Sequence, residues 1–212
     1  MEHESRHELD AKETGRLEAF SDGVFAIAIT LLVLELKVPQ GPGTLGAGLI
    51  AEWPSFAAFV TSFATIGIMW LNHHRLFTLI RRVDHGLLVL NGVLLFGISA
   101  VPFPTELVAR ELGRAGQGLA VAVYAGLMIF IAFAFNALWR YASSPRRQPA
   151  LLRLPHDAPE VVAIHEQYRL GPVGYIAAAV LSHWNATVAL LLMMALALFF
   201  LLPPRERRDA GA

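Results

Sequence analysis

The chain has 212 residues, of which 55% are hydrophobic and only 16% are charged, with seventeen basic and seventeen acidic side chains. This composition is too apolar for a soluble domain of this length and favours a protein that lies in a lipid bilayer. The balanced charge provides no net positive field to attract nucleic acid, and the absence of cysteine excludes disulfides and thiolate metal sites.

The first predicted membrane helix is the most polar one. A helix that crosses a bilayer needs about 20 mostly apolar residues. The uninterrupted apolar run covers only residues 23–34, so the required length is reached by including Glu18, Asp22 and Glu35. Ionisable residues at membrane depth are costly and tend to face water or the interior of a helix bundle. This helix is therefore the first candidate to line a pathway.

Two stripes run along this helix at 100° per residue. One falls within about 60° and contains small, branched and hydroxyl side chains, namely Gly23, Ile27, Thr30 and Leu34. The other lies about 100° away and contains Asp22, Ala26, Ile29 and Val33. One stripe can face a pore while the other faces neighbouring helices, and the alternative for the first stripe is ordinary helix packing.

Three further stretches without Asp, Glu, Lys or Arg are long enough to cross alone, namely residues 53–71, 86–105 and 115–139. A fourth such stretch, residues 170–204, is too long for one crossing at 1.5 Å per residue. We expect it to turn at the polar residues 182–185, which gives a shorter fifth helix opened by Gly171 and Pro172 and a sixth that ends at Pro203 and Pro204. The sequence thus predicts an all-α integral membrane protein with six transmembrane helices per subunit.

The basic residues predict the orientation. With the N-terminus inside, fourteen of the seventeen Lys and Arg residues lie on the inner side, leaving Lys37, Arg110 and Arg114 outside. This asymmetry follows the positive-inside rule and predicts that both termini are cytoplasmic. We expect one transmembrane domain over residues 1–212, with cytoplasmic segments at residues 1–14 (N-terminal tail), 143–167 (linker) and 203–212 (C-terminal tail).

Polar residues gather at the predicted inner ends of the second and third helices, including Trp70, His73, His74 and Asn91. Adjacent histidines point about 100° apart on a helix, which disfavours a shared metal ion, and no H-E-x-x-H pattern is present. A polar cluster that holds the first helix in place fits these residues better. Asp22 could serve as a proton relay or ion ligand, but we favour a structural acid satisfied by hydrogen bonds.

The sequence lacks the motifs of several functional classes. No G-x-S-x-G, P-loop or dinucleotide glycine pattern is present, so we do not expect an enzyme or a bound organic cofactor. A potassium filter of the T-V-G-Y-G type is also missing.

Several motifs resemble the transmembrane protein 175 family of potassium channels, specifically its prokaryotic single-repeat members. The resemblance rests on Arg16 and on F-S-D at residues 20–22, followed by G-V-F-A-I-A-I-T-L-L-V-L. It is reinforced by I-G-I-M-W-L-N-H-H-R-L-F at residues 66–77 and by Asp84, Asn91 and Pro102. These motifs cover about the first half of the chain, and the second half is similar in helix layout.

The resemblance implies a homotetramer in the bacterial inner membrane, with the first helix of each subunit around a central pore that has no filter loop. It places the narrowest point at Ile27, a threonine ring at Thr30 and a further aliphatic ring at Leu34. These positions belong to the stripe already described, whose small pore-facing residue is Gly23. The implied structural polar network consists of Arg16, Ser21, Asp22, Trp70, His73 and Asn91, with His74 as a competitor for the place of His73.

The function implied is a potassium-favouring cation channel that conducts monovalent cations and holds no resident metal. The alternative is a proton-coupled secondary transporter that uses Asp22 and the histidines of the second helix.

Overall fold

The computed structural model describes residues 2–39, 44–146 and 150–203, with the backbone alone for residues 2–11. Within these residues every regular element is a helix, apart from one isolated bridge between Ile80 and Leu152. The helices are α1 (Glu2–Leu31) with its 3-10 extension η1 (Leu32–Glu35), α2 (Leu45–Ala51), α3 (Trp53–Leu79), α4 (His85–Ser99), α5 (Pro102–Glu111), α6 (Gln117–Ala142), α7 (Pro159–Leu181) and α8 (Ala186–Leu201). The all-α prediction is confirmed.

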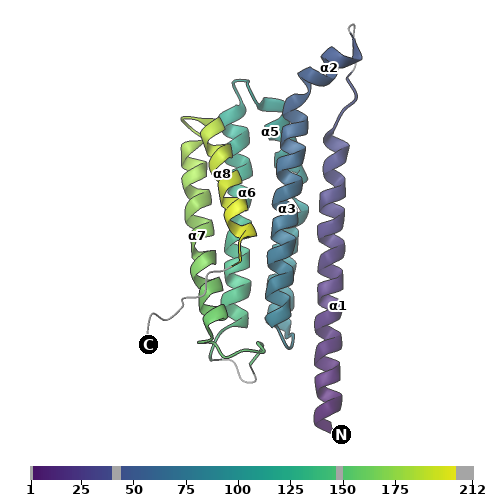
Figure 1. Cartoon of the computed structure of the whole chain (residues 1–212), viewed down its shortest axis with the longest axis vertical. Coiled ribbons are helices and arrows are strands. Elements are labelled where there is room, and N and C mark those ends of the chain that lie inside the picture. The colour runs from purple at the N-terminus through teal and green to yellow at the C-terminus, as the bar shows by residue number, and fades with distance from the viewer. Residues whose placement is uncertain (1, 40–43, 147–149, 204–212) are drawn as a thin grey trace.

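The long helices run side by side in one bundle, with α1 at one edge and α7 at the opposite edge (Figure 1). Four segments of the described chain are long and apolar enough to cross a membrane, namely Lys12–Glu35, Trp53–Leu79, His85–Glu111 and Gln117–Ala142. The chain is therefore a multi-pass membrane protein. The predicted N-terminal tail, residues 1–14, is helical from Glu2 onward and continuous with α1.

The predicted third helix, residues 86–105, is divided in the structure. It consists of α4 and α5, which are separated at Ala100 and Val101. Pro102 contributes to the break because it has no N–H to continue the helical ladder, although Val101 before it keeps helical dihedral angles (φ −57°, ψ −38°). The Val101 carbonyl accepts from the Thr105 N–H at 3.3 Å and from the Thr105 hydroxyl at 2.8 Å, so α5 is hydrogen-bonded from the junction onward.

The predicted start of the fifth helix at Gly171 and Pro172 is wrong. Helix α7 begins at Pro159 and continues through Pro172, so the predicted linker, residues 143–167, is helical over its last part. A proline inside a helix leaves the carbonyl four residues earlier without its N–H donor. Here that carbonyl belongs to Tyr168, and Asn136 Nδ2 of α6 donates to it at 2.9 Å. A side chain of a neighbouring helix thus replaces the missing backbone donor.

The turn predicted at residues 182–185 is confirmed, since α7 ends at Leu181 and α8 begins at Ala186. Asn185 caps α8 by accepting a hydrogen bond from the Val188 N–H at 3.0 Å. Helix α8 ends at Leu201, and of the predicted C-terminal tail, residues 203–212, only Pro203 lies within the described residues.

Buried amide side chains satisfy the last carbonyls of α8. Asn72 Nδ2 of α3 donates to the Phe200 carbonyl at 2.9 Å, and Gln167 Nε2 of α7 donates to the Leu202 carbonyl at 3.1 Å. The 16 residues of α8 extend for only about 24 Å. Because a helix end in an apolar environment needs partners for its free carbonyls, these two amides allow α8 to end partway along the bundle (Figure 1).

Candidate functional site

Helix α1 has one packed face and one exposed face. The packed face lies against α3 and α4 and consists of residues at most 1% exposed, namely Ser21, Phe25, Ala28 and Leu32. The opposite face carries the predicted stripe of Gly23, Ile27, Thr30 and Leu34. Ile27 is 60% exposed and Leu34 is 69% exposed. At 100° per residue the centres of the two faces lie about 160° apart. The stripe therefore points away from its own subunit.

We call this exposed face, formed by Gly23, Ile27, Thr30 and Leu34, the α1 stripe. It is apolar except for the hydroxyl group of Thr30. A Cβ atom added at Gly23 would meet no heavy atom within 4 Å. Thr30 Oγ1 donates its proton to the Ile27 carbonyl at 2.9 Å, so the hydroxyl group is held against the helix. The hydroxyl oxygen still has lone pairs that can accept, and such an oxygen is the kind of group that contacts a cation.

A buried hydrogen-bonded chain joins α1, α3 and α4. Ser21 Oγ donates to the Leu17 carbonyl at 2.8 Å and accepts from Asn91 Nδ2 at 2.9 Å. The carboxamide oxygen of Asn91 then accepts from His73 Nε2 at 2.9 Å. Ser21, His73 and Asn91 are completely buried. In each of these hydrogen bonds, the direction of donation is set by the neighbouring bond in the chain. The three side chains therefore form one cooperative network.

Two further pairs connect α1 to α3 on a more accessible side. Trp70 Nε1 donates to Asp22 Oδ1 at 2.8 Å, and His74 Nδ1 lies 2.8 Å from Glu18 Oε1. Glu18 and Asp22 are four residues apart on α1, and Trp70 and His74 are four residues apart on α3. In each helix the two side chains therefore lie one turn apart on the same face. The antiparallel helices therefore form two successive polar contacts. Asp22, the residue that raised the question of a proton relay, has an indole N–H as its partner.

The structure separates the predicted network residues into groups. Ser21, His73 and Asn91 belong to the buried chain, whereas Asp22 and Trp70 form a neighbouring pair. His73 takes the buried position, and the adjacent His74 contacts Glu18 instead. Arg16 is exposed on α1 and makes no hydrogen bond or ion pair with any described residue.

The contact of Glu18 with His74 was not predicted from the sequence. Its signal is the matched spacing of Glu18 and Asp22 on one helix and of Trp70 and His74 on the other. Over the described ranges, no three His, Asp or Glu side chains gather closely enough to hold a metal ion.

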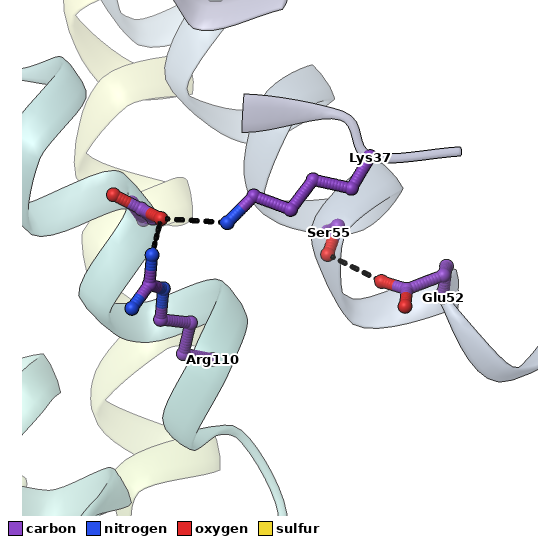
Figure 2. A network of polar contacts seen from close by, with 5 residues as sticks. Lys37, Glu52, Ser55 and Arg110 are labelled. Carbon is purple, nitrogen blue, oxygen red and sulfur yellow. Dashed lines mark hydrogen bonds and ion pairs between the residues drawn. The ribbon is translucent and has the colours of Figure 1, made fainter. Parts of the chain in front are cut away.

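The far end of α1 is also held by polar contacts. Lys37 Nζ, just beyond η1, lies 3.2 Å from Glu106 Oε1 of α5, and Arg110 binds the same carboxylate (Figure 2). In the same region Ser55 Oγ donates to Glu52 Oε2 at 3.1 Å, near the start of α3. The α1 stripe thus lies between two fixed ends of the helix, at the buried chain and at Glu106.

Known proteins resemble this chain in sequence and in structure. The family described as "Endosomal/lysosomal potassium channel TMEM175" matches residues 16–102. A potassium channel of Chamaesiphon minutus is 48% identical over 91% of this chain and 96% of the relative. A potassium channel of Streptomyces collinus is 46% identical over 94% of this chain and 98% of the relative.

A solved structure has the same fold. The crystal structure of a lysosomal potassium-selective channel TMEM175 homolog from Chamaesiphon minutus superimposes with a TM-score of 0.81 at 47% identity. The match covers 89% of this chain and 96% of that chain. Both named relatives are channels and not enzymes, in agreement with the enzyme motifs missing from the sequence. With this identity over nearly the whole length of each relative, the chain belongs to the TMEM175 family.

Proposed function

We propose that the protein is a potassium-favouring cation channel in which four subunits place α1 around a central pore. The observation that carries this proposal is the α1 stripe, which is exposed in the subunit and lies opposite a completely packed face. A membrane helix at the edge of a bundle normally meets lipid or another subunit. The two bacterial relatives are named potassium channels, which supports a conducting role for the stripe.

Ile27 forms the constriction in this proposal. Four branched side chains that converge on one axis make a hydrophobic neck, and such a neck blocks ions by dewetting. An ion that passes must shed part of its water, and potassium holds its water less tightly than sodium. The Thr30 oxygens are the nearest acceptors on the stripe, and Leu34 forms a second apolar ring. Selection through dehydration alone gives a modest preference for potassium.

The proposed subunit crosses the membrane six times, with α4 and α5 as one crossing and α7 and α8 as the last two. Helix α7 has Glu160, Glu166 and Arg169 in its first half, which separates it from the purely apolar helices. Its second half is apolar, and α8 can be short because Asn72 and Gln167 cap its end. Six crossings put both termini on the same side of the membrane. The excess of Lys and Arg on that side makes it the cytoplasmic side in this proposal, with the protein in the inner membrane of a bacterial cell.

Cysteine labelling tests the orientation. The chain has no cysteine, so an impermeant thiol reagent reports only an introduced residue. We expect Ala115→Cys, between α5 and α6, to be labelled on intact cells and Ala150→Cys to be labelled only after lysis. Gly113 is a poorer site because its φ of 79° favours glycine. Labelling of Ala150→Cys on intact cells would reverse the topology.

Ion flux from liposomes tests the channel proposal against a proton-coupled transporter that uses Asp22, His73 and His74. We expect purified protein to release potassium down its concentration gradient, faster than sodium, with no proton gradient imposed. Protein-free liposomes and liposomes with collapsed pH difference are the controls. A flux that stops when the proton gradient is removed would favour the transporter.

A further inference from the structure

A polar cavity lies at the end of the bundle away from the Lys37–Glu106 pair. It has a volume of about 350 Å³ and opens between the end of α6 and the first turns of α7. Its lining residues are Arg140, Ser143, Ser144, Pro145, Arg146 and His165. None of these is acidic and two are arginines, so the lining of the cavity carries a net positive charge.

The wall of the cavity is fixed and its arginines are available. Ser143 Oγ donates to the Trp139 carbonyl at 2.7 Å and contacts His165 Nε2 at 3.0 Å, which joins α6 to α7. Arg140 and Arg146 are exposed and make no hydrogen bond or ion pair with the described residues. Two free guanidinium groups beside the half-buried Ser144 offer the planar donors that match phosphate oxygens.

An apolar strip continues from the cavity along α6. Arg140 shares its helix face with Ala137, Phe133 and Phe130, and all four side chains are exposed. From Arg140 to Phe130 the strip extends for about 15 Å, close to the length of an acyl chain within one leaflet. Helix α7 lies at the edge of the bundle opposite α1, and α6 packs against α7 (Figure 1). In a tetramer with its pore on α1, the exposed strip on α6 can therefore face lipid.

We propose that the cavity binds the phosphate headgroup of an anionic phospholipid from the cytoplasmic leaflet, with an acyl chain along Phe133 and Phe130. The side of the membrane rests on the orientation proposed above. Both arginines contact the phosphate, and Ser144 donates a further hydrogen bond. The apolar strip is what favours a lipid over free phosphate, because a soluble anion would gain nothing from it.

Native mass spectrometry of the purified protein with equal amounts of phosphatidylglycerol and phosphatidylcholine tests this assignment. We expect preferential retention of phosphatidylglycerol, and a weakening of about fivefold for each of Arg140→Gln and Arg146→Gln, since a basic residue near anionic lipid contributes ~1 kcal/mol. Arg153→Gln is the matched control, because Arg153 is exposed at the same end of the bundle and does not line the cavity. Ser144→Asp, which keeps both arginines, should also weaken retention.

Thermal unfolding of each variant in detergent shows whether weaker lipid retention is caused by a less stable protein. Equal retention of the two lipids by the unmodified protein, or an equal loss in Arg153→Gln, would overturn the proposal. Displacement of the lipid by millimolar inorganic phosphate, with no effect of Phe133→Ala, would make this a site for a soluble anion and overturn the lipid assignment. Potassium flux measured on the same preparations is independent of these outcomes, so a failure here leaves the channel proposal standing.

Discussion

Replacing Ile27 by asparagine is expected to raise the basal flux of both potassium and sodium and to bring their ratio towards one. The amide group wets the neck and removes the dewetting barrier that the isoleucine ring imposes. A barrier lower by ~1.4 kcal/mol gives about a tenfold increase in flux. Potassium and sodium efflux from liposomes, normalised to the amount of folded protein, measures the change.

The control distinguishes a pore residue from a packing residue. Ile29 lies on the neighbouring stripe, is half-buried and packs against the core of its own subunit. We expect Ile27→Ala to raise flux per folded protein, whereas Ile29→Ala should lower stability and leave that flux unchanged. If Ile27→Asn keeps the sodium-to-potassium ratio of the unmodified protein, Ile27 does not form the constriction.

Replacing Asn91 by leucine is expected to destabilise the protein by about 2–5 kcal/mol and to reduce the yield of assembled protein. Asn91 is completely buried and bonds to both Ser21 and His73. The substitution leaves the His73 N–H without an acceptor and adds branched bulk beside α1, and each unsatisfied buried group costs about 1–3 kcal/mol. Thermal or denaturant unfolding in detergent measures the loss.

A double-mutant cycle with His73→Phe identifies the cause. The phenylalanine ring can keep the stacking of His73 on Phe77, whose ring centroids lie 4.3 Å apart, while removing the hydrogen bond to Asn91. With both polar partners replaced, no donor is left unpaired between these positions, so the double variant should lose less stability than the sum of the single variants. Strict additivity would show that the bond between Asn91 and His73 is not the source of the effect.

The helix pattern and the α1 stripe were predictable from the sequence because they depend on local periodicity. The apolar run around Ile27 repeats at helical spacing, and the charge-free stretches around it have membrane length. The packed side of α1 differs from the second predicted stripe, since Ser21 and Phe25 are buried whereas Ala26 and Val33 are exposed.

What the sequence could not provide depends on contacts between distant residues. Pro172 indicates a helix start by every local rule, and only Asn136 on α6 allows α7 to pass through it. The choice between His73 and His74 likewise required the position of Asn91, because adjacent histidines are equivalent in a local pattern. Arg16 was assigned to the polar network through the resemblance, and within the subunit it has no described partner.

The central claim, that α1 lines the ion pathway, is tested most directly by zinc block of a single-cysteine channel. In Ile27→Cys, four thiols would surround one axis at the constriction, so that two or more of them can bind one Zn²⁺ ion as thiolates. We predict that low concentrations of Zn²⁺ stop potassium flux through Ile27→Cys, that a chelator restores it, and that Ile29→Cys is unaffected. Potassium flux through folded Ile27→Cys that is insensitive to Zn²⁺ would contradict the claim.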